Sequence, residues 1–128
     1  MKHTFWIPGP LPGLNEIIDA CKNNAHAYGK MKKQWANHCA WHIKAARVPK
    51  MSRVFAEFHW VSSDKRHDPD NIEAAQKFIW DALGARWARV LPNDGWSQNA
   101  GTSHRHSVGK SPGVTVTLDD RSGELDDR

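Results

Sequence analysis

The chain has 128 residues, of which 39% are hydrophobic and 25% charged, as expected for a single soluble globular domain. Its formal net charge of +4 and isoelectric point of about 9.3 are compatible with a phosphate-rich partner but do not identify one. The first apolar run is too short for a signal peptide, and no segment approaches membrane-spanning length. We therefore expect a cytoplasmic protein without a membrane partner. Cys21 and Cys39 lack paired-cysteine metal spacing and are expected to be reduced thiols.

The first half of the chain predicts a strand, two helical segments and a second strand. His3–Ile7 is a short apolar strand, ended by the Pro-Gly-Pro-Leu-Pro-Gly run. Apolar residues at helical spacing start near Leu14, a break is expected near 23–30, and a second helix runs from Met31 to Val48-Pro49. The alternation in Arg53–Val61 predicts the next strand.

A helix is predicted to start at Pro69, which suits the first helical position, and to continue to Leu83. Asp68 then falls at the N-cap, where its side chain can accept a bond from a free backbone N–H. At 100° per residue, the apolar side chains gather on one face. Asp70, Lys77 and Asp81 gather on the opposite face, which the core does not need.

The remainder of the chain predicts weaker strands around 96–102 and 113–118, after a turn at Leu91–Trp96. Between these strands we expect a polar, basic loop over 104–112. Residues 119–128 are highly charged and are expected to form a disordered tail, which leaves residues 1–118 as one domain. The fold class predicted is α+β, with a small mixed sheet packed against two main helices.

The aspartates suggest metal chemistry. Mg²⁺ prefers oxygen ligands, and one or two carboxylates together with substrate phosphate oxygens can hold it. Asp68 and Asp70 are close enough to share an ion, Asp94 is the candidate third carboxylate, and Lys77 could hold a phosphate. Three simpler readings stay open: helix capping for the aspartate pair, turn formation for Asp94, and an i,i+4 surface pair between Lys77 and Asp81.

Other polar groups are less specific. Lys30, Lys32 and Lys33 form either a solvated helix end or a set of phosphate contacts. His104 and His106 would share one face if they lay on a strand, but they lack a third metal ligand.

Four motifs occur together in one order: I-P-G-x-L-P-G-L-N-E-I-I-x-A, K-M-K-K, R-H-D-P-D-N-I-x-x-x-x-K-F-I-x-D-A-L and L-P-N-D-G-W. In this combination the chain resembles the RusA family of Holliday junction resolvases, closest to its phage and prophage branch, over roughly residues 5–96. The helical lysine departs from the type member: Lys77 stands seven residues after the second aspartate, where the type member has four.

The resemblance implies a homodimer that cuts four-way DNA junctions in DNA recombination and repair in a bacterial or phage-infected cell, with Mg²⁺ (or Mn²⁺) as cofactor. The family's metal-binding aspartates carry over to Asp68, Asp70 and Asp94, and its helical lysine to Lys77. A twofold dimer would present one site to each of two opposed strands. The basic residues Lys30, Lys32, Lys33, Lys65 and Arg66 are then expected to contact the DNA backbone.

Two other functions stay open from the sequence. The chain could be a non-catalytic protein that binds branched DNA, in which the aspartates only shape the helix start. It could also be a nuclease of the same chemistry with a broader choice of substrate, such as flaps and forks.

Overall fold

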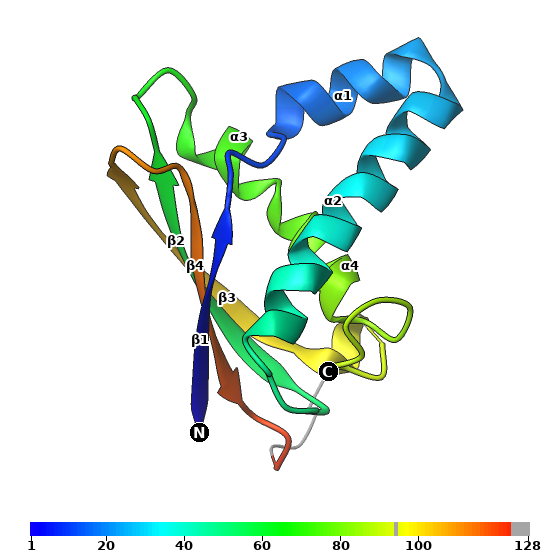
Figure 1. Ribbon diagram of the computed structural model, residues 1–128, viewed down its shortest axis with the longest axis vertical. Helices are drawn as coiled ribbons and strands as arrows, with labels where there is room; N and C mark the ends of the chain where they lie inside the picture. Colours follow the sequence, from blue (N-terminus) through cyan, green and yellow to red (C-terminus); the bar gives the residue numbers. More distant parts are fainter. Residues whose placement is uncertain (94, 124–128) are drawn as a thin grey trace.

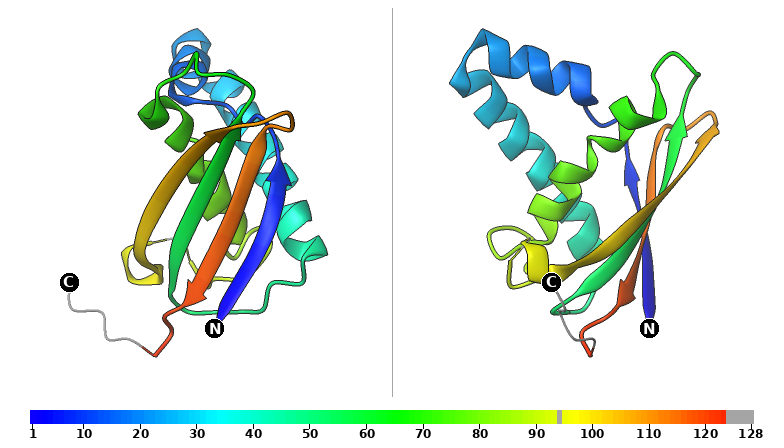
Figure 2. Two further views of the ribbon diagram at one scale, coloured as in Figure 1. Left: turned by 90° about the vertical axis from the view of Figure 1, so that its left-hand side faces the viewer. Right: turned by 180° about the vertical axis from the view of Figure 1, so that it is seen from behind.

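The computed structural model describes residues 1–93 and 95–123 and has a mixed α+β fold. Within these residues, a four-stranded sheet has helices packed against one face, while its other face carries none (Figures 1 and 2). In chain order the elements are β1 (Lys2–Pro8), α1 (Leu14–Asn23), α2 (Ala25–Ala45), β2 (Val54–Ser62), α3 (Pro69–Glu73), α4 (Gln76–Leu83), a 3₁₀ helix (Trp96–Gln98), β3 (Asn99–Val108) and β4 (Gly113–Asp120). The predicted α+β class is thus confirmed.

The strand order across the sheet is β1-β4-β2-β3. β4 pairs antiparallel with both β1 and β2, whereas β2 and β3 are parallel. A parallel pair needs a crossover that carries the chain back along the whole strand, and helices α3 and α4 lie within it. The two ends of this crossover therefore lie at opposite ends of the sheet.

The core lies between the helix-covered face of the sheet and helices α2 and α4. Alternate residues of β2 point inward and are buried, as the sequence alternation predicts. From the helices, Cys39 and Ile43 of α2 meet Phe78 and Ile79 of α4 in the same cluster. Burial raises the pKa of the Cys39 thiol to about 12, so this residue is a protonated core side chain.

The predicted break between the first two helices is confined to Asn24. This residue is extended, with φ −175° and ψ 164°, and its side-chain oxygen accepts a hydrogen bond from Ala27 N at 2.7 Å. An asparagine cap of this kind satisfies one of the free N–H groups of a helix start. Helix α2 therefore starts at Ala25, six residues before the predicted Met31.

The predicted single helix from Pro69 to Leu83 is interrupted at Ala74 and Ala75. Three backbone bonds there have the tighter i→i−3 pattern: Ala75 N to Ile72 O, Lys77 N to Ala74 O, and Phe78 N to Ala75 O. A residue in such a turn adds about 120° of rotation rather than about 100°. The helical wheel that placed Asp70 and Lys77 on one face therefore does not apply across this break.

The last two strands differ most from expectation. The segment 104–108, predicted as part of a loop, belongs to β3, whereas 96–98 form a 3₁₀ helix before that strand begins. β4 continues to Asp120, so the predicted domain boundary at Leu118 falls inside a strand. Asp119 is paired with Lys2, and Arg121 N donates to Arg53 O at 2.8 Å. Of the predicted tail, residues 124–128 lie outside the described residues.

Within the described residues, no helix combines the length and the apolar character that crossing a membrane requires.

Two isoleucines give a matched test of the core. Ile79 of α4 is fully buried, whereas Ile18 of α1 is 40% exposed. Ile79→Ala should lower the free energy of unfolding by about 3 kcal/mol, because it removes buried methyl groups and leaves a cavity. Ile18→Ala should lower it by less than about 1 kcal/mol. Urea unfolding followed by circular dichroism measures both, and equal losses would contradict this placement of the core.

Candidate active site

The two aspartates of the Asp68-Pro69-Asp70 sequence lie on the surface at the start of α3. Asp68 is the N-cap through its backbone, since its carbonyl accepts hydrogen bonds from Asn71 N and Ile72 N at 3.0 and 3.2 Å. Its carboxylate makes no capping hydrogen bond, so the predicted side-chain cap is wrong. Within the described part of the chain, neither carboxylate forms a hydrogen bond or an ion pair, and both are available to an external ligand.

Two polar contacts fix α3 against its neighbours. The side-chain oxygen of Asn71 accepts a bond from Asn15 N at 2.9 Å, at the start of α1. The chain just before α1 comes close to α3, because a Cβ added to Gly13 would lie 2.7 Å from the Asn71 amide nitrogen. On the other side, Glu73 pairs with His106 of β3 at 2.6 Å between Oε2 and Nε2. The aspartates therefore stand on a short helix that is held at both sides.

His104 lies on the helix-covered face of β3, next to this anchor. Its ring stacks on Phe58 at 5.1 Å, and its Nδ1 lies 2.9 Å from Trp60 Nε1. An indole N–H can only donate, so Nδ1 must act as the acceptor and carry no proton. Burial lowers the pKa of His104, the neighbouring His106 lowers it further, and Glu73 opposes these effects.

Lys77 lies on α4 beyond the helix break and is exposed. Among the described residues it forms no ion pair with Asp81, so the simple i,i+4 surface pair is not observed. Its side chain is free to reach an external anion.

The third proposed ligand, Asp94, lies outside the described residues, but its surroundings in the chain are described. Ser97 O accepts a hydrogen bond from Arg53 at 3.0 Å, and Val90 O accepts one from Met51 N at 2.8 Å. Both contacts lie at the start of β2, whereas α3 follows the end of that strand. The nine residues of β2 span roughly 27 Å at about 3.3 Å per residue.

Four of the five predicted DNA-binding residues line two separate concave regions. Arg66 helps to line a small hollow of about 250 Å³, together with His67 and Asn71, next to the aspartates. Asp64 organises this loop, because one carboxylate oxygen accepts from Arg66 N at 2.9 Å and the other lies 3.5 Å from its guanidinium. Lys65 is exposed in the same loop.

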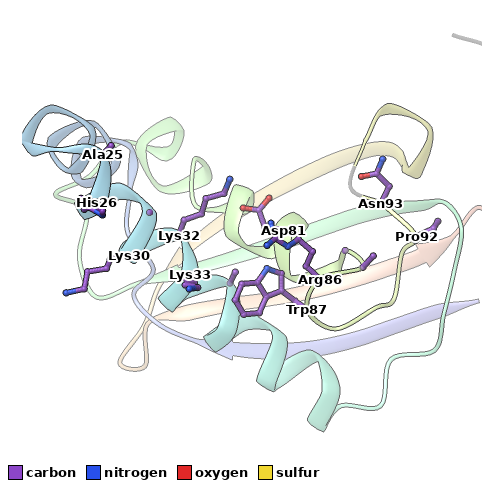
Figure 3. Close-up of a pocket in the computed structure, with 14 residues that line it drawn as sticks. Ala25, His26, Lys30, Lys32, Lys33, Asp81, Arg86, Trp87, Pro92 and Asn93 are labelled. Atoms are coloured by element: carbon purple, nitrogen blue, oxygen red, sulfur yellow. The ribbon is translucent and has the colours of Figure 1, made fainter.

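Lys30, Lys32 and Lys33 instead line a larger pocket of about 680 Å³ between α2 and the segment after α4 (Figure 3). Arg86 and Trp87 complete the wall that faces the lysines, and Pro92 and Asn93 close one end. Sequence reasoning identified the three lysines but missed Arg86 and Trp87, which follow the end of α4 without any motif or periodicity that would single them out.

Across residues 1–93 and 95–123, no group of three or more histidine, cysteine or acidic side chains is arranged to hold a metal ion. The Asp68, Asp70 and Asp94 set is not tested by this observation, since one of its members lies outside those ranges. His104 and His106 do share one face of a strand, but they are bonded to Trp60 and Glu73.

The fold and site together define a small α+β protein with an exposed aspartate pair and a separate basic pocket. No protein-family model matches the chain, and no curated protein sequence matches it.

The position of His104 predicts an acid-sensitive fold. Because its pKa is lowered in the folded protein, unfolding takes up a proton once the pH falls below the ordinary histidine value of about 6.5. The contribution of neutral His104 to the free energy of unfolding is fully present above about pH 6.5. It is lost as the pH falls from there through the lowered pKa of His104 in the folded protein. His104→Gln should therefore show a smaller fall in unfolding free energy between pH 7 and 5, as measured by urea titration at several pH values. An unchanged pH dependence would contradict the assignment.

Proposed function

We propose that the protein is a magnesium-dependent endonuclease that acts on branched DNA, with four-way junctions as its substrate. The observation that carries this proposal is the state of Asp68 and Asp70: both are exposed, and neither carboxylate is used by the protein's own structure. A pair that served only to cap the helix would have its oxygens turned to backbone N–H groups. The resemblance to the RusA resolvases in the same residues supports the proposal.

The donor set suits Mg²⁺, which takes oxygen ligands and retains several waters, so that one or two carboxylates and substrate phosphate oxygens complete its shell. Mn²⁺ accepts the same ligands. When bound, such an ion supplies an activated water and charge neutralisation for phosphodiester hydrolysis.

The chain's own residues would then orient the site, neutralise charge on the phosphate and bind the DNA backbone. Asp68 and Asp70 would orient the site at the start of α3, a helix that is hydrogen-bonded to Asn15 and His106. Lys77 would neutralise charge that develops on the phosphate. Lys65 and Arg66, in the adjoining loop, would bind the flanking backbone phosphates.

The proposal includes a homodimer, because the crossover separates the two parts of the motif. Asp68 and Asp70 lie beyond one end of β2, and the described residues on either side of Asp94 belong to a segment anchored at the other end. A twofold dimer can bring opposite ends of two protomers together at two equivalent places. We therefore propose that each site combines Asp68 and Asp70 of one protomer with Asp94 of the other.

The non-catalytic alternative also has a specific observation in its favour. The larger basic pocket would bind DNA phosphates whether or not the aspartates bind a metal ion. This alternative predicts salt-sensitive junction binding without cleavage in any divalent metal. A broader nuclease would cut forks and flaps as readily as four-way junctions.

Asp70→Asn should retain junction binding but lower the cleavage rate at least about a hundredfold, since loss of even an outer-shell partner of a metal commonly costs ten- to a hundredfold. The matched control is Asp19→Asn, because Asp19 is an exposed aspartate of α1 outside the proposed site. Labelled four-way junctions, forks and flaps, incubated with Mg²⁺ or with a chelator, provide the measurement.

Paired symmetric nicks that require Mg²⁺, absent with Asp70→Asn and unchanged with Asp19→Asn, are the expected result. Normal cleavage by Asp70→Asn would overturn the role of this residue. Binding by the unmodified protein without cleavage in either Mg²⁺ or Mn²⁺ would favour the non-catalytic alternative.

A further inference from the structure

The α2 wall of the larger basic pocket carries small residues among its lysines. Ala25, Gly29 and Ala36 of α2 line its wall. Gly29 lies inside the helix, and a Cβ added there would meet no atom within 4 Å. Glycine is a poor helix former compared with alanine, so Gly29 makes the helix less stable than an alanine at the same position would. The pocket has a volume of about 680 Å³.

Cationic side chains surround this hollow on two sides. Lys30, Lys32 and Lys33 come from α2, and Arg86 comes from the opposite wall (Figure 3). Asp81 is the one acidic side chain among the described lining residues. The pocket is therefore suited to an anionic ligand.

An aromatic ring lies among these charges. Trp87 is partly exposed, lines the same pocket and lies next to Arg86, on the wall opposite the lysines (Figure 3). Indole faces and arginine planes are the surfaces on which unpaired bases stack, and lysines beside them bind the phosphates. A ligand with an aromatic base and a phosphate would use both parts of the pocket.

The wall that carries Arg86 and Trp87 is held by backbone bonds. Ala88 N donates to Ala82 O at 2.8 Å, and Leu91 N donates to Leu83 O at 2.8 Å. Arg89 N reaches Gly84 O at 3.0 Å, with Arg89 itself at φ 58°. These bonds fold the segment back on the end of α4, so the wall is formed before a ligand arrives.

We propose that this pocket receives one unpaired nucleotide of a DNA strand, with its base against Trp87 and its phosphates on the lysines and Arg86. The volume is within the range of pockets that hold small ligands, whereas an intact duplex is too wide to enter. The inference rests on the proposed DNA substrate but not on the cleavage reaction. Such a pocket would let the protein distinguish branched or frayed DNA from a continuous duplex.

The test compares two labelled DNAs in a chelator, so that no cleavage occurs: a blunt duplex and the same duplex with a short single-stranded thymidine tail. Fluorescence anisotropy should show about tenfold tighter binding of the tailed DNA by the unmodified protein, from stacking of one base and its phosphate contacts.

Gly29→Leu places a bulky side chain in the pocket lining, at a helix position where an added Cβ meets no atom within 4 Å, and it should remove the preference for the tailed DNA. Asn37→Leu is the control, because it adds a leucine to an exposed α2 position outside the pocket and should keep the preference. Trp87→Phe retains a ring and should reduce the preference only in part. Thermal unfolding of each variant shows that it is folded.

Equal binding of the blunt and tailed DNAs by the unmodified protein would overturn the inference, as would a preference that survives Gly29→Leu. Neither result depends on cleavage: a protein that prefers tailed DNA but never cuts would uphold the pocket and refute the nuclease. A protein that cuts junctions but binds both DNAs equally would uphold the nuclease and refute the pocket.

Discussion

The parallel pairing of β2 with β3 is the constraint on which the arrangement of the molecule depends. Parallel neighbours cannot be joined by a tight turn, so the chain must travel back along the length of the sheet before β3 begins. The crossover does this through α3 and α4 and buries Phe78, Ile79 and Leu83 against the sheet on the way. It also determines where polar groups go: the aspartate pair at its start and the segment around Asn93 at its finish lie at opposite ends of the sheet.

Much of the first half of the fold could be predicted from the sequence, because its signals come from burial. The alternation of Val54, Ala56, Phe58 and Trp60 marks β2, and all four side chains are buried. Pro69 marks a helix start that the structure confirms. Burial on one side of an element leaves a periodic pattern that a single sequence displays directly.

The features that were missed leave no such pattern. β3 is an edge strand whose 103–108 stretch is polar, because it carries histidines, serines and an arginine, so it reads as a loop. The tight turn at Ala74 and Ala75 is formed by two good helix formers, so local propensity gives no warning of it. The parallel direction of β2 and β3 depends on contacts between distant segments, which no local motif encodes.

The candidate site, too, was predictable from the sequence only in part. Sequence motifs predicted Asp68 and Asp70 as a pair, and the structure leaves both carboxylates without a partner within the described residues. The sequence could not show that Arg66 and the lysines of α2 belong to different hollows, since that separation follows from the fold. Nor could it show the anchoring of α3 by Glu73 and His106, which are 33 positions apart.

The central claim of the proposed function is that aspartates of two protomers form one reaction centre, and mixing two inactive variants tests it most directly. Asp70→Asn and Asp94→Asn should each fail to cut a four-way junction alone. After they are unfolded and refolded together, half of the dimers should be mixed, and each mixed dimer contains one site with all of its aspartates. About one quarter of the normal number of sites should therefore regain activity, seen as single nicks. No recovery of nicking, with mixed dimers shown to form, would contradict the shared site.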